Sequence, residues 1–374
     1  MSEPFFNVSL TADFFDPSGK PVYRDIGTSI LTEQPHIRQN VFTEHRPVIG
    51  PDQISDAHGV IVLTPKITAA TVARADHLLA IGRFGVGYDS VDVAACTNAD
   101  VLVFISAGAV NHSVAEATVG WMIALCHHMR AKDELVRSGR WHDRAQFMGT
   151  ELRDRTLGVI GLGGIARTLL RLLDPFGMKP ALAFDPYLKP EESAPAKLVE
   201  LERLLRESDF VSIHCPLSDQ TTRLIGAREL AWMKPNAFLL NTARGGIVDE
   251  DALYTVLKER RIAGAAIDCF ASEPIVQPDR FGRLDNVLLA PHAIAWTDEL
   301  FRDIGRTVCQ GMVDLSFGKC PRGVVNPAVL DRPGFRAKWA RVRNNPARAR
   351  RDLPVPAAAG ASHRPDPTGD EARL

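Results

Sequence analysis

The segment LGVIGLGGIAR, from Leu157 to Arg167, decides the fold. Its apolar start predicts a buried strand, and a helical stretch over Ile165–Asp174 follows the glycines. Gly161, Gly163 and Ala166 occupy the fixed positions of a GxGxxG-type dinucleotide fingerprint, which permits alanine in the last place. The first glycine allows a tight turn, the second lets the backbone approach a pyrophosphate, and the last small residue lets the helix pack on the sheet. The pyrophosphate then lies over the helix N-terminus, where free N–H groups favour negative charge.

The chain around this fingerprint repeats the pattern of apolar strand and helix. We expect strands at Leu157–Gly161, Ala181–Asp185, Phe210–His214, Ala237–Ala243, Gly264–Asp268 and Asn286–Pro291. Helical segments separate most of them, and Asp251–Arg261 is the clearest helix. This alternation predicts a parallel sheet covered on both faces, and the strand number matches a Rossmann-type, doubly wound α/β cofactor domain.

Asp185 ends the second of these strands, ~20 residues beyond the fingerprint. Its carboxylate can accept hydrogen bonds from the ribose hydroxyls of the cofactor, and it would repel a 2′-phosphate. The cofactor is therefore predicted to be NAD rather than NADP. A solvated acid at a strand end is the alternative, and Lys189 nearby could soften the preference.

Three ionisable residues, Arg244, Glu273 and His292, follow three successive predicted strands. Ligands of open parallel sheets bind at the carboxyl ends of the strands. A guanidinium can grip a carboxylate with two hydrogen bonds and polarise a neighbouring carbonyl. A histidine can give or take a proton near neutral pH, and an adjacent carboxylate favours its imidazolium form. These residues are expected to be catalytic, although each taken alone would more often be structural.

Other residues on this edge of the sheet are candidates for cofactor binding. Cys215 and Pro216 end a fourth strand. Asp268 could accept a hydrogen bond from the nicotinamide carboxamide, with a turn cap as the alternative.

The N-terminal part, up to about residue 105, suits a small α/β domain. Buried strands are expected at Gly59–Leu63, His77–Gly82 and Ala99–Ser106. Ser113 followed by Glu116 resembles a capping box and predicts that a helix starts there. Trp121, Met122, Leu125 and Met129 then recur at helical spacing, which indicates core or subunit packing.

Composition narrows the function classes. The chain has 374 residues, a formal net charge of -1 and 24% charged residues, so no overall field favours nucleic acid or a membrane surface. Its 6 cysteines form no CxxC pair or metal-ligand cluster, which predicts reduced thiols, no metal and a cytoplasmic location. The N-terminus lacks a signal-peptide pattern, and no apolar run is long enough to span a membrane. Residues 331–374, rich in Arg, Pro and Ala, are expected to be a disordered tail, with binding of a nucleic acid or an acidic partner as the alternative.

Several ordered motifs between about residues 55 and 330 resemble those of the D-isomer-specific 2-hydroxyacid dehydrogenase family, in its phosphoglycerate dehydrogenase-like branch. They are RFGVGYDSVD (83–92), SVAE (113–116), GTELRDRTLGVIGLGGIAR (149–167), NTARGGIVDEDAL (241–253), AIDCFASEP (266–274) and APHAIAWT (290–297).

The resemblance implies an NAD(H)-dependent interconversion of a small D-2-hydroxy acid and its 2-keto acid. It implies that Arg244, Glu273 and His292 are catalytic, and that Val86, Gly87 and Arg244 bind the substrate. The implied cofactor-binding residues are Gly161, Gly163, Gly164, Ile165, Asp185, Cys215, Pro216, Thr242, Ala243, Arg244, Asp268 and His292.

The resemblance also implies a split domain organisation and a homodimer joined through the cofactor domain. Residues 1–105 and 297–330 would form the substrate domain, of flavodoxin-like α/β type, and residues 106–296 the NAD-binding domain. The tail does not suit an appended regulatory ligand-binding domain.

This chain departs from the family at a few positions. Relatives often have a basic or polar residue at Gly164 and a glycine at Ala166. Phosphoglycerate enzymes tend to carry an arginine where Val62 and Leu63 stand, which disfavours a phosphorylated substrate, although Arg83 remains.

Two other functions stay open at this stage. A dinucleotide-sensing regulator or corepressor on the same fold could keep the catalytic residues. A formate dehydrogenase usually has glutamine beside the histidine, so Glu273 argues against it.

Overall fold

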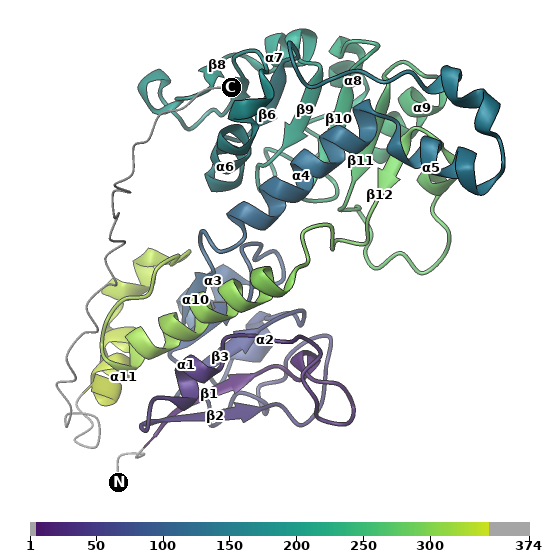
Figure 1. Cartoon of the computed structure of the whole chain (residues 1–374). Coiled ribbons are helices and arrows are strands. Elements are labelled where there is room, and N and C mark those ends of the chain that lie inside the picture. Colours follow the sequence, from purple (N-terminus) through teal and green to yellow (C-terminus); the bar gives the residue numbers. More distant parts are fainter. Residues whose placement is uncertain (1–4, 344–374) are drawn as a thin grey trace, which may run out of the picture.

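The computed structural model describes residues 5–343, which form two parallel β-sheets with helices on their faces (Figure 1). The larger sheet has seven strands in the order β12-β11-β10-β9-β6-β7-β8. They are β6 (Leu157–Ile160), β7 (Leu182–Phe184), β8 (Lys197–Leu198), β9 (Phe210–Ile213), β10 (Phe238–Asn241), β11 (Gly264–Ile267) and β12 (Val287–Leu289).

Every neighbouring pair in this sheet is parallel. From β8 to β11 the order is 3-2-1-4-5-6 of the doubly wound dinucleotide fold, with β12 added at the edge. The Rossmann-type prediction is confirmed, and all six expected strands form. Only the two-residue strand β8 was missed, because it is too short to show a pattern.

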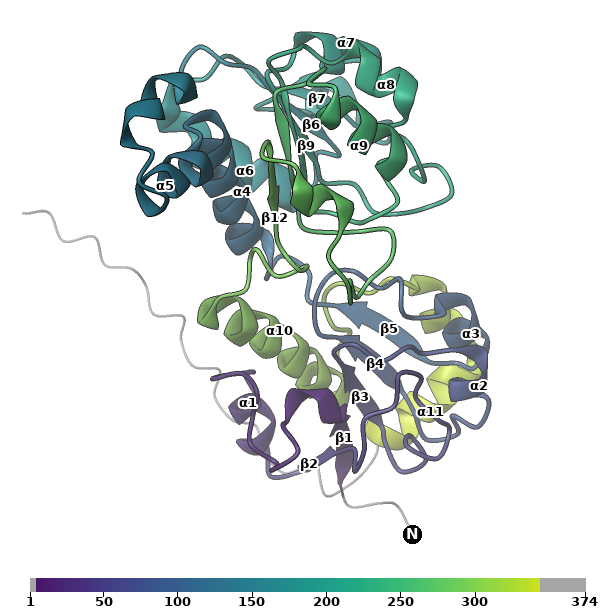
Figure 2. The same cartoon turned by 90° about the vertical axis from the view of Figure 1, so that its right-hand side faces the viewer.

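Helices cover both faces of the larger sheet (Figure 2). They are α4 (Asn111–Cys126), α5 (Met129–Arg137), α6 (Gly164–Leu173), α7 (Leu201–Glu207), α8 (Ala227–Trp232) and α9 (Glu250–Lys258). Short 3₁₀ turns lie at η2 (Trp141–Phe147), η3 (Asp174–Phe176), η4 (Pro190–Glu192) and η5 (Arg280–Arg283).

The smaller sheet has the order β2-β1-β3-β4-β5, which is the flavodoxin-like order that the resemblance implied. Its strands are β1 (Phe6–Leu10), β2 (Ile37–Val41), β3 (Gly59–Val62), β4 (Ala80–Arg83) and β5 (Leu102–Ile105), all paired in parallel. Neither β1 nor β2 was predicted. The sequence IRQNV of β2 carries three polar residues at the sheet edge, so it shows no apolar pattern.

The smaller sheet is flanked by helices from both ends of the chain (Figure 1). They are α1 (Ser29–Thr32), α2 (Ala69–Val72), α3 (Val93–Asn98), α10 (Asp298–Ser316) and α11 (Pro333–Arg343), with 3₁₀ turns η1 (Ala12–Phe14) and η6 (Pro327–Asp331). The chain crosses between the two sheets after β5 and again after β12. The smaller lobe is therefore built from two distant segments, while the exact domain boundaries stay a prediction.

Helix α4 does not begin with the predicted capping box. It starts at Asn111, and no side chain of the described residues caps it. Ser113 and Glu116 lie inside the helix, where Glu116 pairs instead with His112 (Oε2 to Nε2, 3.2 Å). The capping-box prediction was wrong because the helix extends two residues farther toward β5. The packing prediction holds for Trp121, Met122 and Leu125, which are buried, but Met129 begins α5 and is 49% exposed, so it is not part of this core.

The prediction of a disordered tail from residue 331 is wrong for its first part. Residues 333–343 form α11, and Phe335 is completely buried in the core of the smaller lobe. The indole N–H of Trp339 donates to the Leu315 carbonyl (3.0 Å), which ties α11 to α10. Phe335, Trp339 and Val342 recur at i, i+4 and i+7, a helical spacing that the Arg-rich composition obscured. Residues 344–374 of the predicted tail lie outside the described residues.

We expect Phe335→Ala to destabilise the protein by about 3–5 kcal/mol, because it removes a fully buried ring. Urea denaturation of the full chain measures this loss. The matched control is Arg336→Ala, whose exposed ion pair with Asp331 should contribute under ~1 kcal/mol. Equal stability of the two variants would contradict the packing role of α11.

Candidate active site

A cleft between the two lobes collects most of the predicted site residues. Its walls come from the carboxyl ends of β4 in the smaller sheet and of β9, β10 and β11 in the larger one, together with α4 and α10. Among its lining residues are Arg83, Val86, Gly87, Asp89, Ile165, His214, Cys215, Pro216, Thr242, Ala243, Arg244, Asp268, His292 and Trp296.

His292 and Glu273 form the hydrogen-bonded pair that the sequence predicted. Nδ1 of His292 lies 2.8 Å from Oε2 of Glu273, and the other oxygen, Oε1, accepts the Phe270 N–H (2.8 Å). Burial raises the pKa of the Glu273 carboxyl, but the hydrogen bonds from His292 and Phe270 outweigh it and hold the pKa below its usual range. Glu273 is therefore an anion, and its contact with Nδ1 fixes the orientation of the His292 imidazole.

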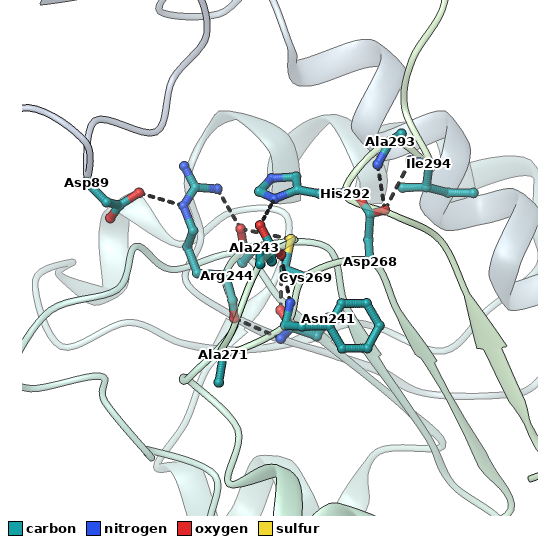
Figure 3. A network of polar contacts seen from close by, with 12 residues as sticks. Asp89, Asn241, Ala243, Arg244, Asp268, Cys269, Ala271, His292, Ala293 and Ile294 are labelled. Atoms are coloured by element: carbon teal, nitrogen blue, oxygen red, sulfur yellow. Dashed lines mark hydrogen bonds and ion pairs between the residues drawn. The ribbon is translucent and has the colours of Figure 1, made fainter. Parts of the chain in front are cut away.

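The turn after β12 aims His292 into the cleft. His292 has a φ of +54°, and its N–H donates to the Asp268 carbonyl (2.8 Å). One carboxylate oxygen of Asp268 accepts the N–H groups of both Ala293 (2.9 Å) and Ile294 (3.1 Å), as Figure 3 shows. Asp268 thus acts as the turn cap that was the alternative reading of this residue. The hydrogen bond expected between Asp268 and the carboxamide of the nicotinamide stays a prediction.

Arg244 reaches the cleft from the turn after β10. The side chain of Asn241 holds this turn, since its Oδ1 accepts the Ala243 N–H (3.1 Å) and its Nδ2 donates to the Arg244 carbonyl (2.8 Å). Nη1 of Arg244 donates to the Ala243 carbonyl (2.6 Å), and Nε donates to Oδ2 of Asp89 (2.7 Å) from the smaller lobe (Figure 3). These bonds fix the plane of the guanidinium.

Gly87 packs directly against this guanidinium. A Cβ at position 87 would lie 1.1 Å from Nη2 of Arg244, so any larger residue would displace the arginine. The predicted substrate residues Gly87 and Arg244 are therefore in contact, and Val86 lines the same cleft. The sequence analysis did not single out Asp89, although this residue lies in the motif RFGVGYDSVD. Its partner Arg244 is 155 residues away in the sequence, so no local pattern indicates the contact.

Arg83 adds a second guanidinium to the cleft. Burial, followed by the charge of Arg244, lowers its pKa to about 10. Its Nη1 donates to the Phe84 carbonyl, while its buried Nε meets no hydrogen-bond partner within residues 5–343. Two cations beside one cleft favour an anionic ligand there.

The glycine-rich loop lies where the strand order of the larger sheet reverses, between β6 and β9. Gly161 has a φ of +88°, and a Cβ there would lie 2.8 Å from the Cys215 backbone nitrogen, so only glycine fits. Gly163 precedes α6, and no atom of the described chain lies within 4 Å of the place where its Cβ would stand. Gly164 is the first residue of α6, and Ile165 lines the cleft.

Asp185 follows β7 beside this loop. Its Oδ2 accepts the Leu162 N–H (3.0 Å) and its Oδ1 accepts the Tyr187 N–H (3.1 Å). The carboxylate therefore holds the loop in shape. The predicted contact of Asp185 with a ribose stays a prediction.

With this geometry established, comparison with known proteins identifies the family. Residues 119–293 match the model of the D-isomer specific 2-hydroxyacid dehydrogenase NAD-binding domain. The chain is 36% identical over 279 residues to a glyoxylate reductase of Thermococcus litoralis, covering 72% of this chain and 84% of the relative. The chain belongs to the D-isomer specific 2-hydroxyacid dehydrogenase family.

Other relatives in the family extend this finding. A D-3-phosphoglycerate dehydrogenase of Methanocaldococcus jannaschii is 38% identical over 279 residues, covering 74% of this chain, which spans only 53% of that relative. The chain thus spans about half the length of that phosphoglycerate dehydrogenase. The crystal structure of a glyoxylate reductase from Paecilomyes thermophila superposes with a TM-score of 0.73 at 26% identity, covering 87% of this chain and 99% of that one.

The cofactor of 2-hydroxyacid dehydrogenases is a nicotinamide dinucleotide, and the crevice of this member fits it. The loop at Gly163 leaves open space above the N-terminus of α6, where a pyrophosphate can approach backbone N–H groups. Thr242 lines the cleft, and its buried Oγ1 has no hydrogen-bond partner within the described part of the chain. A buried hydroxyl of this kind is suited to a polar ligand.

Glu273→Gln should lower kcat/KM for keto-acid reduction, the activity proposed below. The variant loses the carboxylate that pairs with His292 (2.8 Å) and fixes the orientation of its ring. A hydrogen bond to a charged group contributes about 1.5–3 kcal/mol, which corresponds to a loss of about 10–100-fold in kcat/KM. Unchanged kcat/KM would mean that Glu273 does not act through His292.

Proposed function

We propose that this chain is an NAD(H)-dependent oxidoreductase that interconverts a small D-2-hydroxy acid and its 2-keto acid. The observation that carries the proposal is that His292, paired with Glu273, and the Arg244 guanidinium line one cleft together with Ile165 of α6. The cofactor would be held by Gly163, Asp185, Cys215, Pro216, Thr242 and Ala243. A bound nicotinamide supplies or accepts a hydride at the 2-carbon of the substrate.

Arg244 grips the substrate carboxylate, with the backbone N–H groups of Val86 and Gly87 beside it. Its positive charge also stabilises the oxygen on which negative charge develops. His292 donates a proton to that oxygen in reduction and removes it in oxidation, through the ring nitrogen that does not face Glu273. Glu273 orients the His292 ring, and Asp89 orients the Arg244 guanidinium.

The substrate is proposed to be small and unphosphorylated, such as glyoxylate or hydroxypyruvate. Val62 and Leu63, at the end of β3, are buried and apolar, and they offer no charge to a phosphate. The test is oxidation of NADH by the purified chain with a panel of 2-keto acids that includes phosphorylated ones. Turnover of an unphosphorylated acid supports the proposal. Tight NADH binding without turnover of any acid would overturn it in favour of a dinucleotide sensor.

We also propose a homodimer joined through the cofactor lobe, in the cytoplasm. Trp141 and Met148 follow α5 and are 59% and 78% exposed, and Val136 on α5 is 63% exposed. Such apolar side chains on a projecting segment are typical of a subunit interface. Sedimentation of the full chain tests this proposal. Among residues 5–343, no helix is both long and apolar enough to cross a membrane.

Replacing Asp185 with alanine should narrow the preference for NADH over NADPH. The carboxylate repels a 2′-phosphate and accepts bonds from a 2′-hydroxyl. Loss of one charge-assisted interaction of about 1.5–3 kcal/mol corresponds to an about 10–100-fold change in the ratio of kcat/KM values. Because Asp185 also holds Leu162, affinity for both cofactors should fall. An unaltered ratio would mean that another residue reads the ribose.

A further inference from the structure

Cys269 lies beside the acid–base pair and takes no part in the proposed reaction. It follows β11 and is buried, and its Sγ donates a weak hydrogen bond to the Ala243 carbonyl (3.4 Å). Its Sγ, a carboxylate oxygen of Glu273 and an imidazole nitrogen of His292 all lie within 4.8 Å of one another. Figure 3 shows the Cys269 sulfur next to the His292 ring. The structure thus brings a sulfur, an oxygen and a nitrogen ligand to one point.

We propose that Cys269, Glu273 and His292 form a binding site for a soft divalent cation of the Zn²⁺ type, and that its occupation reversibly switches the enzyme off. Zn²⁺ takes thiolate, imidazole and carboxylate ligands at about 2.0–2.3 Å in a tetrahedral arrangement. Ligand atoms in such an arrangement lie about 3–4 Å apart, so the three side chains need only small rotations.

The ligand set selects the class of metal. A thiolate favours Zn²⁺ and similar soft ions, whereas Mg²⁺ and Ca²⁺ require six or more oxygen ligands. Three protein ligands leave the fourth position for water, as in open zinc sites. The ion has access from the cleft, because the His292 and Glu273 side chains are 44% and 34% exposed. Cys269 releases its thiol proton to solvent as the metal–sulfur bond forms.

Occupation of this site would remove the acid–base function. Nδ1 of His292 would bind the metal ion, and its hydrogen bond with the Glu273 carboxylate would be lost. The ion would also place positive charge beside the imidazole, which opposes protonation of the ring. The effect on turnover rests on the proposed function, whereas binding of the metal does not.

Titration of the metal-free, full-length chain with Zn²⁺ by calorimetry, and with Co²⁺ by absorption, tests the site. We expect one tightly bound equivalent of Zn²⁺ and, with Co²⁺, a thiolate-to-metal charge-transfer band. Cys269→Ser should lose the band and bind Zn²⁺ more weakly by more than the about 10–100-fold that loss of an outer-shell partner costs. The control is Cys320→Ser, which removes an exposed cysteine and should bind like the wild type.

Inhibition of keto-acid reduction by Zn²⁺ is the second readout. Cys269→Ser should keep its metal-free turnover and need more Zn²⁺ for half inhibition, by the same factor as its loss of Zn²⁺ affinity. If it folds poorly by thermal melting, Cys269→Ala replaces it. Absence of the charge-transfer band in the wild type, or equal Zn²⁺ affinity of Cys269→Ser and wild type, would overturn the inference. Metal binding with the band but without turnover of any keto acid would refute the proposed function and leave the site intact.

Discussion

Replacing His292 with alanine should lower kcat for keto-acid reduction by about 10²–10⁴-fold, the usual contribution of a positioned general acid. The imidazole is held for this task by Glu273 on one nitrogen (2.8 Å) and by the turn that Asp268 caps. Because the turn depends on backbone N–H groups rather than on the ring, the variant should keep the cleft and still bind NADH. Steady-state kinetics, together with quenching of protein fluorescence by NADH, measure the two effects separately.

The matched control for this variant is His112→Ala. His112 is exposed on α4, pairs with Glu116, and is not among the residues that line the cleft. Its turnover should equal that of the wild type. Near wild-type turnover of His292→Ala would remove His292 as the proton donor, and loss of NADH binding together with turnover would assign it a structural role instead.

The cofactor lobe could be predicted because its signals are local. The run LGVIG, the glycines and the acid at the end of the next strand all lie within one βαβ unit, and the central strands β6, β9, β10 and β11 are buried on both faces. The residues after β9, β10, β11 and β12 could then be placed on one edge by the rule for parallel sheets. The meeting of His292 and Glu273 is a consequence of that rule.

The contacts that cross between the lobes could not be predicted in this way. Asp89 and Arg244 are 155 residues apart, and no periodic pattern links them. The failure at α11 has a different cause, since composition suggested disorder while three apolar residues at helical spacing were enough to dock a helix. The false capping box at Ser113 shows that a short motif inside a helix can mimic its start.

Loss of the Arg244 guanidinium is expected to cause the second large fall in activity. Arg244→Ala should lower kcat/KM for the keto acid by about 30- to 5,000-fold, with a smaller loss of NADH binding because Arg244 is also expected to contact the cofactor. Removing one partner of a desolvated, hydrogen-bonded charge pair costs about 2–5 kcal/mol, and each 1.36 kcal/mol is a factor of ten in rate. The loss should appear in both KM and kcat, because the proposed role of Arg244 is to bind the substrate carboxylate and to stabilise the developing oxyanion.

Two further variants separate charge from geometry. Arg244→Lys keeps the positive charge but loses the planar fork that Asp89 and the Ala243 carbonyl hold, so it should recover only a minor part of the lost rate. Arg206→Ala, which removes an exposed guanidinium paired with Glu202 on α7, should leave both constants unchanged. Full activity in Arg244→Lys would show that a point charge suffices, and then the fixed plane of the guanidinium against Gly87 would have no part in substrate binding.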